Sequence, residues 1–446
     1  MRREDGFALP TVLFMLLAAF AIVSVSVTAS VNTQRGVVRD QGTKSAVQVA
    51  EAGLSAALLH YNRIPPSETN PCSPVTASDP DGAGWCQPIS GSFNGAPYTY
   101  QVHPYTDGTG KFILDVVGTS TVNGASRRIA VRASASSGWN VFEDYQVKSG
   151  EWIHMDSNAE IRAGAATNGD MVLSSNARQC GQASVGVGKQ MQLISNAQYY
   201  QNHECSTPNS VVNEEELILP AVNQGDAPTN NNNSYFFGTN IVTSGKARDA
   251  CWNQVRADGE DGSCGPRHLD LSSNTAVTLQ GGTYSFCKLT MSSNSGLYVA
   301  GGETAVIYFD SPEDEACGYS SGVVQLDMAS NARISPTEGS SANVQLLFVG
   351  SEDRQTQIHM SSNTYIPNAC EQNFVLYAPL SDITMNSNST YCGGLAGKTL
   401  HMDSNASVRI PPGGVNFEIP TTAPHYEVER FVECTATPQT PPDAGC

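Results

Sequence analysis

The chain has 446 residues and a formal charge of -18, with 24 Lys and Arg against 42 Asp and Glu. A charge of this sign repels a phosphate backbone, because nucleic-acid affinity comes largely from Lys and Arg that displace condensed counterions, so nucleic acid is excluded as a partner. Charged residues make up only 15% of the chain, beside 40 Gly and 24 Pro. This composition indicates many short strands and turns and excludes an all-helical globule.

The N-terminal segment is apolar. No residue from Phe7 to Val31 is charged, and a helix of that length spans a hydrocarbon core of about 30 Å. The leader before it, residues 1–6, contains Arg2 and Arg3, which favours the cytoplasmic side for the leader. The sequence therefore predicts a single-pass membrane protein with an extracytoplasmic head, at the cell surface or on a filament. Cleavage of an ordinary secretory signal near Ala29 is the alternative.

A helical pattern continues beyond the apolar segment. Small and apolar residues recur at three- and four-residue steps and form one stripe, made of Val47, Ala50, Leu54, Ala57, Leu58 and Tyr61. Pro10 would be near the start of a chain cleaved after Gly6, where a proline forfeits no intrahelical hydrogen bond. We expect one helix over residues 7–63, roughly 85 Å long at about 1.5 Å per residue, that ends before Pro65.

Two stretches of this segment carry a family resemblance. The run Gly6-Phe7-Ala8-Leu9-Pro10-Thr11, followed by an apolar helix, resembles the class III signal of type IV pilins and type II secretion pseudopilins. Residues 48–54, Gln-Val-Ala-Glu-Ala-Gly-Leu, resemble the Ala-Glu-Ala region of the PilX-type minor pilin N-terminal domain. The resemblance covers about the first 60 residues.

This resemblance implies a route of processing and assembly. The resemblance implies that a prepilin peptidase cleaves after Gly6 and methylates Phe7, and that the helix packs into a filament with other pilins on the pilus assembly platform. The positions of the helix concerned are Thr11, Ala50, Glu51 and Leu54. Where Thr11 stands the family usually has Glu, so the likeness is to a minor component at a filament tip. The alternative is an anchor that never enters a filament.

A small β-domain is expected over residues 64–138. Its three strand-like runs, Tyr98–Val102, Phe112–Val117 and Arg128–Ala133, alternate in polarity and predict an antiparallel meander. We expect this sheet to pack on the helix and bury its apolar stripe.

The 12 cysteines indicate disulfides. They contain no CxxC pair, which excludes zinc-finger spacing, and an even number outside the cytoplasm is typical of an oxidising compartment. Connectivity does not follow from sequence. Pairing between neighbours favours Cys72 with Cys86, Cys251 with Cys264 and Cys434 with Cys446.

One phrase recurs nine times from about Trp139 onward: an apolar residue, a variable residue, Ser-Asn and a small residue. Its asparagines are Asn158, Asn176, Asn196, Asn274, Asn294, Asn331, Asn363, Asn388 and Asn405. The steps between them are 18, 20, 78, 20, 37, 32, 25 and 17 residues. Self-similarity on this scale predicts the stacked coils of a parallel β-solenoid over residues 139–420.

Each position of the phrase has a physical role. The apolar residue points into the coil, and Asn tolerates the left-handed conformation of a corner. Coils about 4.8 Å apart place equivalent Asn side chains within hydrogen-bonding reach, as a ladder. Residues 374–410 resemble the β-helical domain that accompanies PilX-type N-termini, although that family usually has Gly-Asn-Ala where this chain has Ser-Asn-Ala.

Two segments break the pattern. Residues of about 197–270 form an irregular insertion on one face of the solenoid, where such proteins often carry binding loops. We expect either contact with a surface ligand or a plain solvated loop. Residues 421–446 are assigned to a C-terminal tail.

Candidate chemistry is sparse. His154, His359 and His401 precede the phrase in the same register as Asp270 and Asp327, at an outward strand position. The other members of this row are Thr290, Thr384 and Gln192, which favours a solvent-facing row over a metal or acid-base site. We therefore predict no catalytic residue, no metal ligand and no cofactor.

Two turns contain Ca²⁺-type ligands. Residues 79–82 and 258–262 are rich in Asp and Gly, but neither is a complete Ca²⁺ loop. The turn preferences of Asp and Gly explain both equally well.

The sequence as a whole predicts a mainly β protein with a long pilin-like helix, a small antiparallel sheet and a parallel β-solenoid. The function we expect is that of a non-enzymatic minor pilin or pseudopilin, an adhesin or assembly component with a surface or glycan ligand. The alternatives are a membrane-anchored carbohydrate-active β-helix enzyme and a plain structural protein of the cell envelope.

Overall fold

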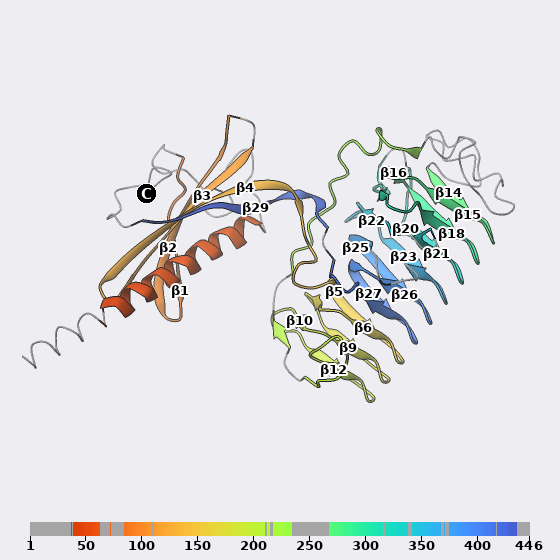
Figure 1. Cartoon of the computed structure of the whole chain (residues 1–446), viewed down its shortest axis with the longest axis horizontal. Coiled ribbons are helices and arrows are strands. Elements are labelled where there is room, and N and C mark those ends of the chain that lie inside the picture. Colours follow the sequence, from red (N-terminus) through yellow and green to blue (C-terminus); the bar gives the residue numbers. More distant parts are fainter. Residues whose placement is uncertain are drawn as a thin grey trace, which may run out of the picture. The chain divides into compact units, whose positions relative to one another are not determined.

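The structure is a computed structural model. It describes residues 37, 39–62, 72, 84–108, 111–209, 212–214, 217–233, 267–314, 317–337, 341–366, 370, 374–415 and 417–434. The chain divides into two compact units, one formed by Met1–Ser136 with Ala423–Cys446 and the other by Ser137–Thr422. Both units are built mainly of β-strands (Figure 1).

The first unit contains a five-stranded antiparallel sheet in the order β1-β2-β3-β4-β29. Its strands are β1 (Ile89–Phe93), β2 (Ala96–Thr106), β3 (Phe112–Val122), β4 (Ala125–Trp139) and β29 (Ile419–Cys434). Asn-Gly turns at Asn94 and Asn123, both with positive φ, join β1 to β2 and β3 to β4, as is typical of tight hairpins. Most of β29 lies in residues 421–446, which were predicted to form a C-terminal tail.

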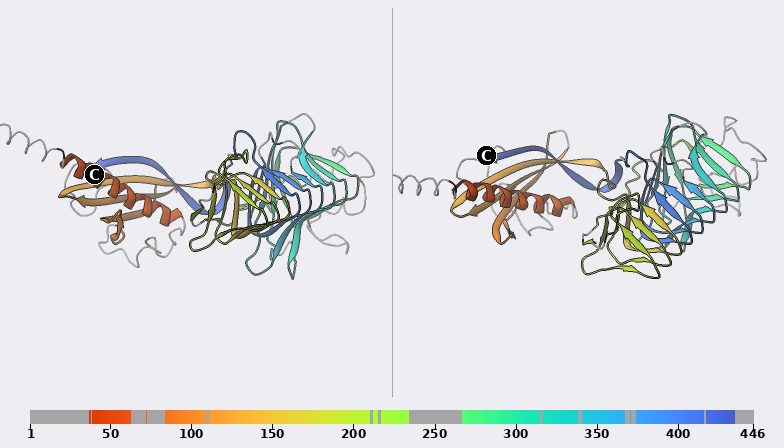
Figure 2. Two further views of the ribbon diagram at one scale, coloured as in Figure 1. Left: turned by 90° about the horizontal axis from the view of Figure 1, so that it is seen from below. Right: turned by 60° about the horizontal axis from the view of Figure 1, so that its bottom comes forward.

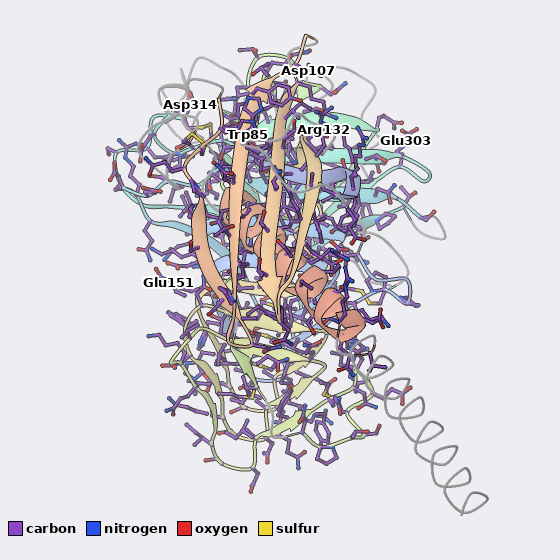
Figure 3. The ribbon with its side chains drawn as sticks, turned by 90° about the vertical axis from the view of Figure 1, so that its left-hand side faces the viewer. Trp85, Asp107, Arg132, Glu151, Glu303 and Asp314 are labelled. Carbon is purple, nitrogen blue, oxygen red and sulfur yellow. A yellow bond between two sulfur atoms is a disulfide. The ribbon has the colours of Figure 1, made fainter. Side chains whose placement is uncertain are left out.

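The outer face of this sheet carries a polar row. Trp85 contacts His103 of β2, with ring centroids 5.2 Å apart and ring planes tilted by 31°. Next to His103 in register is Asp115 of β3, which accepts two hydrogen bonds from the guanidinium of Arg132, from Nε at 2.7 Å and from Nη2 at 2.9 Å. Figure 3 shows Trp85 and Arg132 at the same level of the sheet. This pair stabilises the pairing of β3 with β4.

The N-terminal helix corrects the sequence prediction. Within the described chain it covers residues 39–62, with Val37 also helical, about 36 Å at about 1.5 Å per residue. Most of the predicted helix over residues 7–63 lies outside the described residues, so no long pilin helix is present in them. The helix is found where its apolar stripe is buried, with Ala50, Leu54 and Tyr61 packed against the sheet, and such packing supplies most helix stability.

The membrane prediction is corrected as well. Within the described residues, no helix is both long and apolar enough to cross a bilayer. The helix of residues 39–62 is amphipathic, and its exposed side carries an ion pair between Lys44 and Asp40 at 2.9 Å. The segment Phe7–Val31, on which the single-pass prediction rested, lies outside the described residues.

The second unit is a parallel β-solenoid. Its described strands are β5 (Val147–Met155), β6 (Glu160–Arg162), β7 (Ala165–Thr167), β8 (Met171–Leu173), β9 (Arg178–Cys180), β10 (Ala183–Val185), β11 (Met191–Leu193), β12 (Gln198–Tyr200), β13 (Asn213–Glu214), β14 (His268–Leu271), β15 (Ala276–Leu279), β16 (Gly282–Phe286), β17 (Lys288–Met291), β18 (Gly296–Val299), β19 (Thr304–Phe309), β20 (Val323–Met328), β21 (Arg333–Pro336), β22 (Asn343–Phe348), β23 (Thr356–Met360), β24 (Tyr365–Ile366), β25 (Phe374–Met385), β26 (Thr390–Cys392), β27 (Gly394–Met402) and β28 (Ser407–Arg409). They form a large parallel sheet and a second parallel sheet in the order β12-β9-β6-β28-β26-β24-β21-β18-β15.

The coils are not stacked in chain order. The first coil, with β5 and β6, lies beside the last, with β27 and β28, so that Met155 pairs in register with Met402 and Ile161 with Val408. From β5 the chain builds outward to β11 and β12, then resumes at β14 and β15 at the opposite end of the sheets and returns coil by coil to β27. Figure 2 shows the resulting stack, in which the yellow coils continue from the blue ones.

The nine phrases form the nine corners between the two sheets. All nine asparagines have φ between 59° and 68°, in the left-handed region that Asn tolerates better than most residues. The turn closes when the N–H of the small residue donates to the variable residue, as from Ala332 to the carbonyl of Ala329 at 3.0 Å. Each corner is tied to the next coil, for example by Asn331 N–H, which donates to the carbonyl of Ser362 at 3.2 Å.

The apolar residue of the phrase fills the interior. In eight of the nine copies it is fully buried, namely Met155, Leu173, Leu271, Met291, Met328, Met360, Met385 and Met402. Leu193 is 48% exposed, because its strand β11 pairs only with β8 and ends the stack. Aromatic rings add to this core, with Phe309 and Phe348 stacked at 4.1 Å between ring centroids.

Residues 217–233 form a strap along the side of the stack (Figure 1). At one end Leu217 N–H donates to Asn168 Oδ1 at 2.7 Å. In the middle the hydroxyl of Tyr377 on β25 donates to the carbonyl of Pro220 at 2.6 Å. At the other end Asn233 Nδ2 donates to the carbonyl of Ser285 on β16 at 2.6 Å. The strap therefore contacts coils of both halves of the chain.

The disulfides join neighbours in sequence. Cys72 and Cys86 are bonded, as predicted, and the described residues of the solenoid contain three further bonds, Cys180–Cys205, Cys287–Cys317 and Cys370–Cys392. Cys434 is also disulfide-bonded. Cys251, Cys264 and Cys446 lie outside the described residues.

Candidate functional site on the outward face of the solenoid

A polar row runs across the large parallel sheet, one residue before the apolar residue of each phrase. In spatial order it contains Asp270, Thr290, Asp327, His359, Thr384, His401, His154, Val172 and Gln192, each paired in register with the next. Val172 is the one apolar member and was not predicted. The alignment inferred from the sequence is thus present. The order along the row was not predictable, because it follows the order of the coils and brings His401 next to His154.

These two histidines form the centre of the candidate site. Their ring centroids are 5.3 Å apart and their planes are nearly perpendicular. Between them lies the carboxylate of Asp156, with Oδ1 3.4 Å from His154 Nε2 and Oδ2 3.8 Å from His401 Nε2. The three side chains are 40%, 29% and 34% exposed, so the group is open to solvent and to solutes.

Neighbouring side chains hold this group in place. Ser174 Oγ donates to Asp156 Oδ1 at 2.6 Å, and the backbone N–H of Asp156 donates to the carbonyl of Met402 at 2.8 Å. Asp403 places its Oδ1 3.9 Å from His401 Nε2. The carboxylate that faces both rings is therefore oriented from two neighbouring coils.

Asp156 and Asp403 were not predicted as site residues, although the sequence contains a signal for them. The hexapeptide His-Met-Asp-Ser-Asn-Ala occurs twice without change, at residues 154–159 and 401–406. These are the only two phrases whose variable residue is Asp, since the phrase after His359 reads Met-Ser-Ser-Asn. The two identical hexapeptides are the ones that the coil order places side by side.

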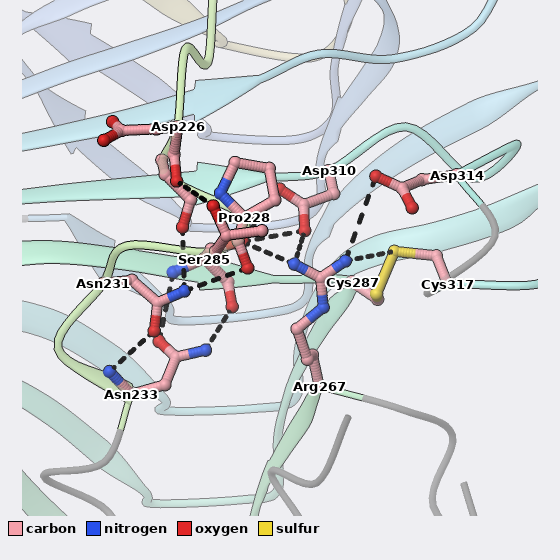
Figure 4. Close-up of polar contacts among 12 residues, drawn as sticks. Asp226, Pro228, Asn231, Asn233, Arg267, Ser285, Cys287, Asp310, Asp314 and Cys317 are labelled. Atoms are coloured by element: carbon pink, nitrogen blue, oxygen red, sulfur yellow. Dashed lines mark hydrogen bonds and ion pairs between the residues drawn. A yellow bond between two sulfur atoms is a disulfide. The ribbon is translucent and has the colours of Figure 1, made fainter. Parts of the chain in front are cut away.

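A second cluster of ligand-type side chains lies inside the solenoid, at Cys287, Asp310 and Cys317. Both sulfurs are committed to a disulfide. Asp310 is fully buried and forms an ion pair with Arg267, which is 6% exposed. The hydroxyl of Ser285 donates to both carboxylate oxygens of Asp310, at 2.9 Å and 2.8 Å. The close-up in Figure 4 shows these contacts, and they give the cluster a structural role.

Burial changes the pKa of the carboxyl group in this ion pair. It raises the pKa of Asp310 to about 6, although the charge of Arg267 and the hydrogen bond from Ser285 both lower it and Asp314 raises it further. The strap residue Asn233 is joined to the same place through Ser285, whose backbone N–H donates to Asn233 Oδ1 at 3.1 Å. The ion pair therefore fastens both the strap and the coil of β16.

The remaining predicted site residues fall into three groups. Ala50 and Leu54 are buried between helix and sheet, and Glu51 is exposed. One side-chain rung of the predicted ladder runs from Asn294 Nδ2 to Asn274 Oδ1 at 3.3 Å. The predicted residues that lie outside the described part of the chain are Gly6, Phe7, Thr11 and the two Asp-rich turns at 79–82 and 258–262.

Comparisons with known proteins add little. No family model and no curated protein sequence matches the chain. Among solved structures the chain is similar to a competence-associated pilin, ComZ from Thermus thermophilus, with 12% sequence identity and a TM-score of 0.27, over 88% of this chain and 97% of that one. A TM-score and a sequence identity this low support no conclusion about this chain.

Proposed function

We propose that the chain is a pilin-like surface protein, a minor pilin or pseudopilin whose helix–sheet unit joins other pilins and whose solenoid is the displayed part. The supporting observation is the unit that follows the Gly6-Phe7 pattern. Its helix of residues 39–62 buries Ala50, Leu54 and Tyr61 against an antiparallel sheet. The prepilin peptidase and the pilus assembly platform are the partners that this function requires.

The disulfides support a location outside the cytoplasm. Every cysteine among the described residues is disulfide-bonded, and such bonds persist in oxidising compartments. The solenoid offers a large outward face with a polar row, which suits recognition of an external surface. The proposed function is therefore adhesion or assembly without catalysis, with a surface or glycan ligand.

The mature N-terminus tests this proposal. Intact-mass analysis of protein purified from its native host is expected to give a chain that begins at methylated Phe7. A Gly6→Leu variant should remain uncut, and an Ala29→Leu variant, which blocks a small-residue signal cleavage, should still begin at Phe7. A chain that begins at Ser30 and changes only in the Ala29→Leu variant would overturn the proposal.

Localisation gives a second readout. Immunogold labelling of the head is expected to decorate filaments or their tips. Even labelling over the envelope, with filaments bare, would favour a structural protein of the envelope. Release of sugars from glycans by the purified protein, lost on substitution of a carboxylate, would favour a carbohydrate-active enzyme.

A further inference from the structure

We propose that His154, Asp156 and His401 form a binding site for a divalent transition-metal ion, with Zn²⁺ as the expected ion, at the seam between the first and last coils. This inference goes beyond the proposed function and does not depend on it. It rests on the position, the spacing and the chemical type of the side chains, and on the support that neighbouring residues give them.

The pairing of the backbone strands fixes the positions of the two histidines. His154 of β5 and His401 of β27 are paired in register in adjacent parallel strands, and both side chains point to the outward face. Asp156 follows two residues after His154, at the corner. Three ligand atoms, one from each residue, lie within 4.8 Å of one another. The two strands are thus a rigid platform that brings the ligands together before any ion binds.

The spacing is close to that of a bound ion. Tetrahedral Zn²⁺ has bonds of about 2.0–2.2 Å to nitrogen and oxygen, which places neighbouring ligand atoms about 3.3–3.5 Å apart. Asp156 Oδ1 is 3.4 Å from His154 Nε2 and Asp156 Oδ2 is 3.8 Å from His401 Nε2, and one ligand atom from each of the three residues can be chosen so that all lie within 4.8 Å of one another. Small rotations of the side chains close the difference. The carboxylate of Asp403, 3.9 Å from His401 Nε2, is within reach of the fourth position, which water otherwise fills.

The ligand types indicate which ion binds. Imidazole nitrogen suits Zn²⁺, Cu²⁺ and Ni²⁺, whereas Ca²⁺ and Mg²⁺ take oxygen ligands. Ser174 donates to Asp156 Oδ1 at 2.6 Å, which is the kind of outer contact that orients a ligating carboxylate. Trp152, with its ring centroid 6.5 Å from that of His401, lies beside the site.

A natural control exists in the same row. His359 has the same register position and outward direction, but Ser361 stands where His154 and His401 have Asp156 and Asp403 two residues later. Its register neighbours are Asp327 and Thr384. The structure therefore assigns the ion to the seam and not to this third histidine.

The test is a titration of the chelator-treated full-length protein with Zn²⁺ alone, in which isothermal titration calorimetry measures the binding. One equivalent is expected to bind, and His154→Ala, His401→Ala and Asp156→Asn should each abolish this binding. His359→Ala should bind as the unchanged protein does. A Ser174→Ala variant should bind about 10–100-fold more weakly, as is typical when an outer contact to a ligand is removed.

Three further measurements keep the test independent of folding. Circular dichroism checks that each variant is folded, and Co²⁺ bound in place of Zn²⁺ should give the visible absorption of a four-coordinate ion only when both histidines are present. Zn²⁺ is also expected to raise the unfolding temperature of the unchanged protein, because it binds only the folded chain. Equal binding by the unchanged protein and a folded His154→Ala/His401→Ala variant would overturn the inference, as would equal loss in His359→Ala.

Discussion

The imidazole of His268 shows how burial fixes a protonation state. The residue is buried at the start of β14, with Nε2 2.8 Å from Thr290 Oγ1. Burial, and then the charge of Lys288, lower its pKa to about 4. An unfolded chain protonates the imidazole near pH 6.5. Between these values only the unfolded chain binds the proton, so this residue costs stability as pH falls through that window.

We expect His268→Gln to remove this dependence. The stability of the variant relative to the unchanged protein should rise by about 3 kcal/mol as pH falls from 7 to 4, since each unit of pKa shift is worth about 1.4 kcal/mol. Urea unfolding at both pH values measures the difference. A relative stability that is the same at both pH values would contradict the prediction.

The buried pair of Arg267 and Asp310 makes the second prediction at this scale. Asp310→Ala leaves a guanidinium buried without its partner, so we expect a loss of about 3–5 kcal/mol. Replacing both residues with apolar ones, as in Arg267→Met with Asp310→Leu, should recover most of this loss. Chemical denaturation at pH 7 measures both variants. A double variant as unstable as the single one would show that the ion pair itself stabilises the fold.

At the scale of single elements, the corner turn was predictable and the helix length was not. The preference of Asn for a left-handed turn is local, so nine repeated phrases specified nine corners. A helix is stabilised mainly by what it packs against, and an apolar run does not reveal where a sheet covers it. The described helix, residues 39–62, contains the whole stripe from Val47 to Tyr61, which the sheet covers.

The corner at Asn331 tests the role of the left-handed conformation. Its φ is 62°, and a side chain with an ordinary Cβ pays about 1–2 kcal/mol there. We expect Asn331→Ala to lose about that much stability, whereas Asn331→Gly, which adopts this conformation freely, should lose less. Thermal and urea unfolding measure both. If Ala and Gly were equally destabilising, the side-chain contacts of Asn331 would matter more than its backbone conformation.

The contact of helix with sheet depends on a glycine. A Cβ on Gly118 of β3 would lie 2.4 Å from the carbonyl oxygen of Ala50, so the helix would have to move. We expect Gly118→Ala to cost about 1–3 kcal/mol, as is typical of overpacking. Gly108, where an added Cβ meets nothing within 4 Å, is the matched control and should tolerate Ala. Urea unfolding of both variants measures the two losses of stability, and equal losses would contradict the prediction.

At the scale of the whole molecule, the order in which the coils stack could not be predicted from the sequence. The repeats predicted stacking, but the partner of each coil depends on contacts between residues far apart in the chain. Leu193 appeared equivalent to Met402 in the phrase, yet one ends the stack and the other lies at its centre. For the same reason the sequence offered His154 and His401 only as members of a row. The contacts of both histidines with Asp156 could be found only from the order of the coils in the structure.

The position of the first coil beside the last has a consequence for the nascent chain. Strand β5 is synthesised early, but the strand that completes its pairing, β27, begins 239 residues after Met155. At about 5–20 residues per second this delay is about 10–50 s. During that interval one edge of β5 has no native neighbour, and an open edge is a template for pairing with other chains. The half-made protein is therefore at greatest risk of aggregation before its final coil is made.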